Sequence, residues 1–513
     1  MPGDRAGQGG VVTTVLEVRR GSYHDSVSLM QASRAVSASD GVEAALVAMA
    51  TELNLDLLDG MGFDRPVGAG PNDLFVAVRA RDDDAAARAR DVLDSALTEL
   101  SAGRGSGGAA TGDLASGPAP RTVSAAARQA PATLALVSVP GPHAYVEAMD
   151  ALEAGLSVVV FSDNVPVEEE VALKDEGRRR DLLVMGPDCG TAIVGGVGLG
   201  FANAVRPGEV GFVSASGTGA QQLSCLLDAA GVGISHLLGV GGRDLSAKVG
   251  GRSTLQALAA LDADPATELI VVVSKPPAEA VAEQVRKVAA DLRTPVVLAL
   301  LGKGQPDLTA VAAEVIQRLG GEPAKPRSWP APQPRRAARG SLRGLFAGGT
   351  LCDEAMLIAA QALGPVRSNI PLEPDWALPD DLRASGHLMI DFGDDRLTRG
   401  RPHPMIDNRA RLDRLATEAA DPEVAVVLLD VVLGFGAHPD PAAELAPAVS
   451  AAREAAVARG GHLAAVVSLC GTASDPQGLE RQAEALVRAG ASVHLSNADA
   501  TRTAVALVEG SGE

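Results

Sequence analysis

Aromatic residues are scarce in this chain of 513 residues, which has only two Trp, two Tyr and eight Phe. Hydrophobic residues nevertheless make up 46% of it, so the core must be built from Ala, Val and Leu, the residues typical of buried parallel strands. The chain also contains 57 Gly and is longer than one hydrophobic core requires. The composition therefore predicts several α/β domains.

Excess positive charge and long apolar runs are also missing. The net charge of −19 argues against nucleic acid and anionic membranes as partners. Apolar runs extend to roughly ten residues or fewer, too short to span a bilayer. Residues 1–10 lack the apolar stretch of a signal peptide. We expect a cytoplasmic protein in which helix ends and a few cations make any anion site locally.

Cysteine is rare, and Cys189, Cys225, Cys352 and Cys470 do not have the spacing of a metal site. We expect free thiols in a reducing compartment and no bound metal. The Gly-x-Gly-x-x-Gly fingerprint is absent too, which disfavours NAD. Cys189 lies in the turn Gly186–Gly190 after a predicted strand, where a nucleophile is one interpretation. A packing thiol is the favoured interpretation, because no His lies nearby in the sequence.

The clearest local pattern begins at residue 210, where Val-Gly-Phe-Val-Ser-Ala-Ser-Gly-Thr-Gly leads into a run with apolar residues at helical spacing. This predicts a strand, a tight turn and a helix that ends at Gly231. The free N–H groups of the helix N-terminus, together with the hydroxyls of Ser216 and Thr218, suit a phosphate or another small anion. A purely structural Gly-rich turn is an equally weighted alternative.

The same unit occurs a second time. Leu223 and Gly231 are each followed 133 residues later by their counterparts, Met356 and Gly364. Two copies of one open α/β sheet predict two helix N-termini that face each other across a pseudo-dyad. The predicted anion ligands are Ser216, Gly217, Thr218, Gly219, Gly348, Gly349 and Thr350.

A few charged residues are predicted to complete this site. Lys275 follows an apolar strand and would place an ammonium at the edge where open α/β sheets bind ligands. Arg243, on a Gly-rich turn, points toward the same edge. Arg401 and His403 lie in a Pro-containing loop and suit carboxylate binding and proton transfer near neutral pH. A Pro-fixed loop with a structural His has equal weight.

The elements predict an α/β protein built from consecutive domains. A small α+β domain of the ferredoxin-like kind, in the order β-α-β-β-α, comes first. A Rossmann-like βαβαβ half domain and two flavodoxin-like parallel-sheet domains follow. The predicted ranges are 1–101 for the N-terminal domain, 102–121 for a linker, 122–204 for the Rossmann-like domain, 205–321 and 342–513 for the two copies, and 322–341 for a Pro- and Arg-rich linker.

These segments resemble succinyl-CoA synthetase. Residues 130–320 are similar to the second half of the CoA-binding domain and the ligase domain of its α subunit, and residues 342–507 to the C-terminal domain of its β subunit. Gly186–Gly190 stands where that family has Gly-Pro-Asn-Cys-Pro-Gly, and Ser214–Thr218 where it has Ser-Arg-Ser-Gly-Thr. Over nearly its full length the chain is identified as a member of the FdrA family.

The departures from the synthetase concern its ATP-dependent step. The synthetase phosphorylates a His in the α ligase domain, whereas Leu300–Pro306 and the residues after it contain no His. Lys275 replaces the Glu that orients that His, and the β subunit's ATP-grasp domain is missing. The resemblance therefore implies phosphate as a substrate in place of a phosphohistidine carrier, with no cofactor firmly required.

Membership of the FdrA family implies a component of oxamate carbamoyltransferase in allantoin catabolism. In that reaction phosphate attacks the carbamoyl group of oxalurate and gives oxamate and carbamoyl phosphate. The chain would act with other subunits as a hetero-oligomer on a small-molecule substrate. The predicted catalytic residues are Lys275, His403 and Cys189, and the predicted substrate-carboxylate ligands are Arg401 and Arg243.

Two further interpretations stay open. The first is an acyl-CoA ligase subunit that binds CoA near Gly186–Gly190 and uses the ATP site of a partner. The second is a non-catalytic scaffold subunit whose partners supply the chemistry. The pair of Gly-Thr turns favours an active site, because a scaffold does not need them.

Overall fold

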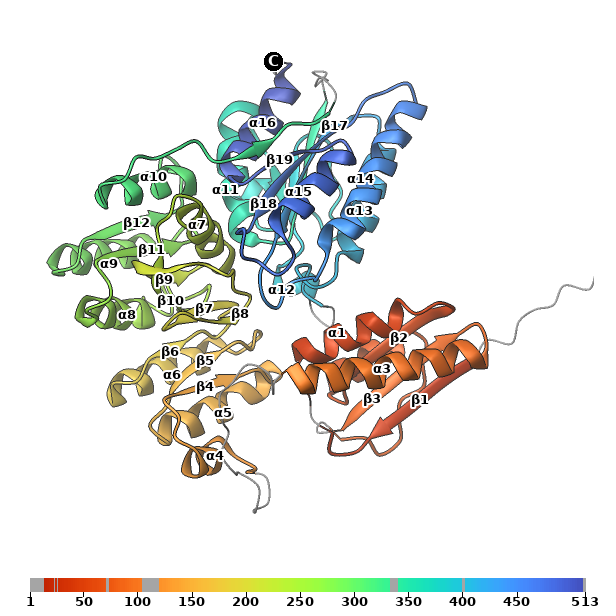
Figure 1. Cartoon of the computed structure of the whole chain (residues 1–513), viewed down its shortest axis with the longest axis horizontal. Helices are drawn as coiled ribbons and strands as arrows, with labels where there is room; N and C mark the ends of the chain where they lie inside the picture. Colours follow the sequence, from red (N-terminus) through yellow and green to blue (C-terminus); the bar gives the residue numbers. More distant parts are fainter. Residues whose placement is uncertain are drawn as a thin grey trace, which may run out of the picture. The chain divides into compact units, whose positions relative to one another are not determined.

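The computed structural model describes residues 13–22, 24, 26–70, 73–103, 120–332, 340–398 and 402–510 (Figure 1). It divides into two compact units. The first consists mainly of the residues before Pro120, and the second of those from Pro120 onward. Each unit is described by itself. None of the helices in these ranges is long and apolar enough to cross a membrane.

The first unit is built on a three-stranded antiparallel sheet in the order β1-β3-β2. Helices α1 and α3 pack together against one face, where they share an apolar core with the sheet. The predicted order β-α-β-β-α is present, with one helix added. The elements are β1 (Thr13–Arg19), α1 (Ser26–Ser37), β2 (Val42–Met49), α2 (Glu52–Gly60), β3 (Leu74–Ala80) and α3 (Asp83–Gly103).

Helix α2 was not predicted, and its local cause can be identified. The Thr51 hydroxyl accepts a hydrogen bond from the Asn54 N–H at 3.4 Å and caps the helix N-terminus. Leu55 and Leu58 lie one turn apart and are buried in a second core on the other face of the sheet. A helix of nine residues shows too few apolar positions for periodicity alone to identify it.

The second unit starts with the predicted Rossmann-like half domain, a parallel sheet in the order β4-β5-β6. The hairpin β7–β8 that follows pairs with β10 of the next sheet. The boundary between these two sheets therefore lies between Met185 and Thr191, ahead of the predicted domain boundary after residue 204. The elements are α4 (Val123–Gln129), β4 (Leu134–Val137), α5 (Gly141–Glu153), β5 (Ser157–Val160), α6 (Val167–Arg180), β6 (Val184–Met185), β7 (Thr191–Val194) and β8 (Val197–Gly200).

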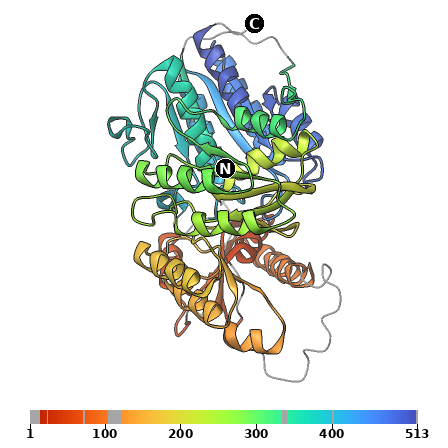
Figure 2. The same ribbon diagram turned by 90° about the vertical axis from the view of Figure 1, so that its left-hand side faces the viewer.

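The first copy of the repeat forms a sheet in the order β12-β11-β9-β10-β7-β8, of which the first four strands are parallel. The uninterrupted Val, Ile and Leu runs of its central strands are buried on both faces. Helices α8 and α9, drawn in green, cover the face that is turned toward the viewer in Figure 2. The elements are β9 (Pro207–Ala215), α7 (Gly217–Ala229), β10 (Ile234–Gly239), α8 (Arg252–Ala263), β11 (Leu269–Ser274), α9 (Glu279–Asp291), β12 (Val296–Leu300) and α10 (Leu308–Arg318).

The second copy confirms the repeat. Its sheet has the order β13-β19-β18-β17-β14-β16-β15, and the run β18-β17-β14-β16 repeats the order β12-β11-β9-β10 of the first copy. The elements are β13 (Ser328–Trp329), β14 (Ser341–Phe346), α11 (Gly349–Leu363), β15 (Arg367–Ser368), η1 (Pro374–Trp376), β16 (Leu388–Asp391), α12 (Asp395–Thr398), α13 (Arg409–Ala420), β17 (Val424–Val432), α14 (Pro441–Ala458), β18 (Ala464–Cys470), α15 (Leu479–Arg488), β19 (Ser492–His494) and α16 (Asn497–Glu509).

The two copies pack through corresponding helices, because α7 contacts α11, and α10 contacts α16. The Gln222 amide of α7 donates to the Leu495 carbonyl at 2.8 Å. The Cys225 and Cys470 sulfur atoms lie 3.9 Å apart, and all four cysteines are buried free thiols. These contacts hold the first turn of α7 next to the first turn of α11.

Candidate functional site

The predicted helix N-termini of α7 and α11 meet. The Ser216 hydroxyl accepts a hydrogen bond from the Gly219 N–H at 3.0 Å and lies 2.6 Å from the Thr350 hydroxyl. Both hydroxyls are buried, and one belongs to each copy of the repeat. The juxtaposition that the repeat predicted is therefore present, and it aligns two positive helix ends on one region.

Glycine at the two turns allows this close approach. A Cβ added to Gly348 would lie 2.8 Å from the Thr218 methyl group, and one added to Gly219 would lie 2.9 Å from that of Thr350. Any side chain at either position would push the two helices apart. Gly217 and Gly349, which were also predicted, lie at the accessible side of the turns.

Two of the predicted anion donors are already engaged, because the Gly219 N–H donates to the Ser216 hydroxyl and the Gly348 N–H donates to Asp430. The N–H groups of Ala347 and Gly348 donate to the Asp430 carboxylate at 2.7 and 2.8 Å. Arg411 pairs with the same carboxylate at 3.1 Å, so this buried charge is compensated. An anion at the start of α11 would therefore be bound by the N–H groups of Gly349 and Thr350, with the Gly348 turn held rigid by Asp430.

Lys275 lies where the sequence placed it, directly after β11 and against the first turn of α11. A Cβ added to Gly349 would lie 2.8 Å from the Lys275 ammonium. Burial lowers the pKa of Lys275, but Asp353, Asp391 and Asp188 outweigh it and raise that pKa. In the described part of the chain no carboxylate lies within 4.0 Å of this ammonium, so it is available to a ligand.

The carboxyl groups beside Lys275 were missed by sequence reasoning. Burial raises the pKa of Asp391 to about 7 and that of Asp353 to about 6, although Lys275 opposes both shifts. Asp391 ends β16, and an Asp at the carboxyl end of a parallel strand was the signal available in the sequence. The site therefore combines one cation with carboxyl groups that titrate near neutral pH.

The loop that carries the predicted carboxylate ligand is described only in part, and Arg401 lies outside the described residues. His403 packs on Phe201 with ring centroids 5.6 Å apart. Its Nδ1 accepts the Met405 N–H at 3.2 Å, so a neutral ring carries its proton on Nε2. Burial lowers the pKa of His403 to about 4. This value corrects the predicted titration near neutral pH; a catalytic role stays a prediction.

Cys189 has the environment of a packing thiol. It is 3% exposed, and its sulfur lies 3.6 Å from the Thr191 carbonyl oxygen. Burial, assisted by the neighbouring Asp188, raises the pKa of the thiol to about 12. The thiolate that a nucleophile needs is therefore scarce at neutral pH.

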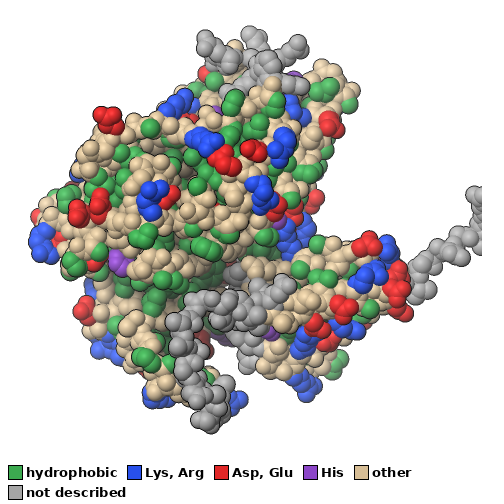
Figure 3. All heavy atoms as spheres, in the orientation of Figure 1, with side chains coloured by type: hydrophobic (Ala, Val, Ile, Leu, Met, Phe, Trp, Pro, Cys, Tyr) green, Lys and Arg blue, Asp and Glu red, His purple; other side chains and the backbone are tan. Residues whose placement is uncertain are grey.

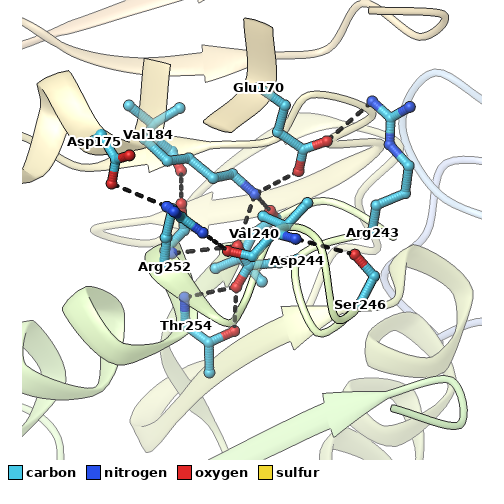
Figure 4. A network of polar contacts seen from close by, with 12 residues as sticks. Glu170, Asp175, Val184, Val240, Arg243, Asp244, Ser246, Arg252 and Thr254 are labelled. Atoms are coloured by element: carbon cyan, nitrogen blue, oxygen red, sulfur yellow. Dashed lines mark hydrogen bonds and ion pairs between the residues drawn. The ribbon is translucent and has the colours of Figure 1, made fainter. Parts of the chain in front are cut away.

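Arg243, the other predicted carboxylate ligand, is held by protein groups. Its guanidinium lies 3.0 Å from a Glu170 oxygen and donates to the Val165 carbonyl at 2.8 Å. Figure 4 shows it reaching across to Glu170 at the edge of a larger polar network. Its side chain is 38% exposed, so a ligand would share the guanidinium with Glu170.

The centre of that network is the fully buried Lys174. Its ammonium donates to Glu170 at 2.7 Å, to Asp244 at 2.8 Å and to the Val240 carbonyl at 2.9 Å, which uses all three of its protons (Figure 4). The network thereby ties α6 to the loop after β10. Gly241 of this loop packs so closely on the Pro187 carbonyl that a Cβ there would overlap it.

Gly241 thus packs against the turn Gly186–Gly190. Within this turn, Asp188 has a left-handed φ of 57° and is exposed. Left-handed backbone at a non-Gly residue is uncommon and concentrates at functional sites. The Lys174 network thus positions a carboxylate whose field reaches Lys275.

Two tandem parallel sheets with facing helix N-termini define a succinyl-CoA synthetase-like CoA-ligase architecture. A protein-family model described as CoA-ligase matches residues 345–507. A second model, described as the AllF heavy metal-associated domain, matches residues 12–112. In the ranges that the structure describes, no group of three or more His, Cys, Asp or Glu side chains could hold a metal ion.

Several known proteins are similar to the chain. The protein YahF of Escherichia coli K12 is 40% identical over 92% of this chain and 94% of its own. The α 2 subunit of the ADP-forming succinate–CoA ligase of Archaeoglobus fulgidus is 30% identical over 30% of this chain and 54% of its own. A dinucleotide-forming acetyl-coenzyme A synthetase 1 from Ca. Korarchaeum cryptofilum aligns with 16% identity over 76% of this chain and 86% of its own, at a TM-score of 0.29.

The chain belongs to the FdrA family of proteins related to succinyl-CoA synthetase. It spans about half the length of the succinate–CoA ligase subunit that it matches.

Proposed function

We propose that this chain is the phosphate-binding subunit of a carbamoyl transferase that converts oxalurate and phosphate into oxamate and carbamoyl phosphate. The observation that carries the proposal is the meeting of the α7 and α11 N-termini, joined by the hydrogen bond between Ser216 and Thr350, beside the Lys275 ammonium, with which no described carboxylate forms an ion pair. Helix N-termini and an ammonium are the groups that bind phosphate in proteins. Phosphate held there would be positioned for attack on an acyl carbon.

Charge at the site supports a phosphate that binds locally. Acidic and basic side chains are interspersed over the face drawn in Figure 3, and the net charge of −19 gives no general attraction for anions. Asp353 and Asp391 would repel a phosphate dianion if both were ionised. Burial raises the pKa of Asp391 to about 7, so a proton on this group can lessen the repulsion near neutral pH, whereas Asp353, with a pKa of about 6, is mostly ionised there.

The experiment measures binding of phosphate, carbamoyl phosphate and CoA to the full chain by thermal melting and calorimetry. We expect phosphate and carbamoyl phosphate to stabilise the protein, by about 2.7 kcal/mol at a hundred times the dissociation constant. Lys275→Ala should weaken phosphate binding about tenfold or more, because it removes the site's cation. Lys303→Ala, at an exposed loop position, is the matched control. Equal phosphate affinity in both variants would contradict the proposal.

A second candidate is an acyl-CoA ligase subunit, favoured by the match of residues 345–507 to the CoA-ligase family. It predicts CoA binding near Gly186–Gly190 and an ATP-binding partner chain. Stabilisation by CoA alone would select this function. No response to any of the three ligands would favour a scaffold subunit.

Both enzymatic functions involve partner chains. The succinate–CoA ligase relative is named as an α subunit, which supports a hetero-oligomer here as well. We place the reaction in the cytoplasm, in keeping with four buried free thiols.

A further inference from the structure

The carboxyl group of Asp391 lies where the backbone of α11 begins. A Cβ added to Gly349 would lie 2.6 Å from Asp391 Oδ2, on the same side as the Lys275 ammonium. The Asn369 side chain fixes the Asp391 backbone by accepting from its N–H and donating to its carbonyl, both at 2.9 Å. This carboxyl group is therefore held in place beside the proposed phosphate position.

One oxygen of this carboxyl group is free. Asp391 is 3% exposed, and its Oδ1 accepts the Gly393 N–H at 2.8 Å. Within the described ranges, no donor lies within hydrogen-bonding distance of Oδ2. This oxygen of a nearly buried residue lies at the first turn of α11 and beside the Lys275 ammonium, so a ligand bound there can complete its hydrogen bonding.

The groups that face Asp391 are known from each neighbouring element. Lys275 approaches from β11, Asp353 from α11, and Asp394 from the turn after β16. His403 lies on the far side of Gly393, with its Nε2 2.9 Å from where a Cβ would be. Only Lys275 carries a positive charge among them, because the His403 ring is neutral above its pKa of about 4.

The proposed reaction needs an acid. The nitrogen that leaves the carbamoyl carbon is an amide nitrogen, and an unprotonated amide anion is a very poor leaving group. The thiol of Cys189 and the imidazole of His403 have pKa values of about 12 and 4, far from neutral. The pKa of Asp391, at about 7, lies where an acid is both protonated and reactive.

We propose that, in the carbamoyl transfer put forward above, the Asp391 carboxyl group is the acid that protonates the leaving nitrogen. A phosphate oxygen bonds to the carbamoyl carbon, and the bond from that carbon to the nitrogen breaks. The electron pair left on nitrogen takes the proton from Asp391 Oδ2, which releases oxamate. The proton of the attacking hydrogen phosphate then returns to the carboxylate, so that atoms and charge balance.

This role has a consequence for binding that does not depend on turnover. A phosphate dianion placed beside Asp391 raises the pKa of the carboxyl group further, so binding draws a proton from the buffer. Calorimetric titration of the full chain with inorganic phosphate at pH 8, in buffers of different ionisation enthalpy, measures this uptake. We expect roughly half a proton per site or more.

Three carboxyl variants identify the group that takes the proton. Asp391→Asn keeps an acceptor for the Gly393 N–H and should lose the uptake, while Asp353→Asn and Asp394→Asn should retain it. The titration of phosphate itself is common to all four proteins and cancels in the comparison. Uptake that persists in Asp391→Asn, or that disappears in Asp353→Asn instead, would overturn the assignment.

The second readout is formation of carbamoyl phosphate from oxalurate. Asp391→Asn should lower kcat about 100-fold or more, leave the KM for phosphate nearly unchanged and abolish the alkaline limb of the pH profile. Asp394→Asn should keep the alkaline limb, moved to slightly lower pH because one of the charges that raise the Asp391 pKa is removed. Wild-type turnover with full activity in Asp391→Asn would defeat this inference alone. A wild-type chain that neither binds phosphate nor forms carbamoyl phosphate would defeat the proposed function on which the inference rests.

Discussion

Gly349 is the residue at which the backbone of α11 passes between two charged side chains. A Cβ at this position would meet Asp391 Oδ2 at 2.6 Å and the Lys275 ammonium at 2.8 Å. The lysine can swing away at little cost, whereas Asp391 is held by Gly393 and Asn369. Glycine here keeps the ammonium and the carboxyl group against the first turn of the helix.

Gly349→Ala should therefore impair ligand binding more than folding. We expect the free energy of unfolding to fall by about 1–3 kcal/mol, the usual cost of an extra methyl group in a packed site. Phosphate affinity should fall about tenfold or more, because the ammonium is displaced. Gly60→Ala is the control, since a Cβ there meets nothing within 4 Å. Unchanged phosphate affinity in Gly349→Ala would show that the anion does not use this turn.

Asp353 gives a prediction about pH. It is 7% exposed, and none of the described residues hydrogen-bonds its carboxyl group. Burial raises its folded-state pKa from 3.8 to about 6, so the ionised form is the destabilised one. Stability is therefore lost as the pH rises from about 4 to about 6, and the loss is constant above that range.

Asp353→Asn should remove this loss. At pH 7.5 the variant should be more stable than the wild type by up to about 3 kcal/mol, and near pH 4 the two should be equal. Urea unfolding at both pH values measures the difference. The same increment at both pH values would mean that the gain comes from packing and that the carboxyl group does not titrate as described.

At the scale of elements, the Lys174 network joins α6 to the loop after β10. Its ammonium has three acceptors and no access to solvent, so its removal leaves the buried Asp244 carboxylate without a cation and Glu170 with Arg243 as its only cation (Figure 4). Lys174→Met should cost about 3–5 kcal/mol in urea unfolding. Lys248→Met, at an exposed position, should stay within about 0.5 kcal/mol of the wild type. Equal effects of the two variants would contradict the assigned role of the network.

The elements that sequence reasoning located are those with strong local signals. The strands β11, β17 and β18 are mostly apolar runs, and the Gly-Thr turns at Thr218 and Thr350 recur 132 residues apart. The repeat predicted two copies of one sheet but not the order of their strands. Short elements were not predicted. Helix α2 depends on a cap at Thr51, and the sequence of the hairpin β7–β8 does not indicate that it pairs with β10.

The candidate site was predictable to the same extent. The glycines and the hydroxyls lie on the repeated turns, and Lys275 follows a predicted strand at the same edge of the sheet, so their convergence could be inferred. The carboxyl group of Asp391 was missed although it ends a parallel strand, because the sequence does not show which strand lies beside the α11 turn. The ion pair between Arg243 and Glu170 was not predicted either, because Glu170 is distant in sequence and lies on a helix of the preceding domain.

At the scale of the second unit, the two copies are joined by a carboxylate that belongs to one of them. Asp475, in the loop after β18, accepts hydrogen bonds from the Asn203 amide at 2.8 Å and the Ala204 N–H at 2.7 Å, just before β9. It also accepts the Thr472 N–H at 2.8 Å. The chain entering the first copy is thus fastened to the second copy near the C-terminal edge of its sheet.

Asp475→Ala should leave these three donors without their acceptor inside the protein. Each buried donor without a partner costs about 1–3 kcal/mol, so we expect a loss of at least about 3 kcal/mol in urea unfolding. Because the lost contacts join the copies, the transition should also broaden or split, with a smaller m-value, as the copies unfold separately. Asp381→Ala, in an exposed turn, should keep one sharp transition. A sharp transition with an unchanged m-value in Asp475→Ala would mean that the interface between α7 and α11 alone is enough to couple the two copies.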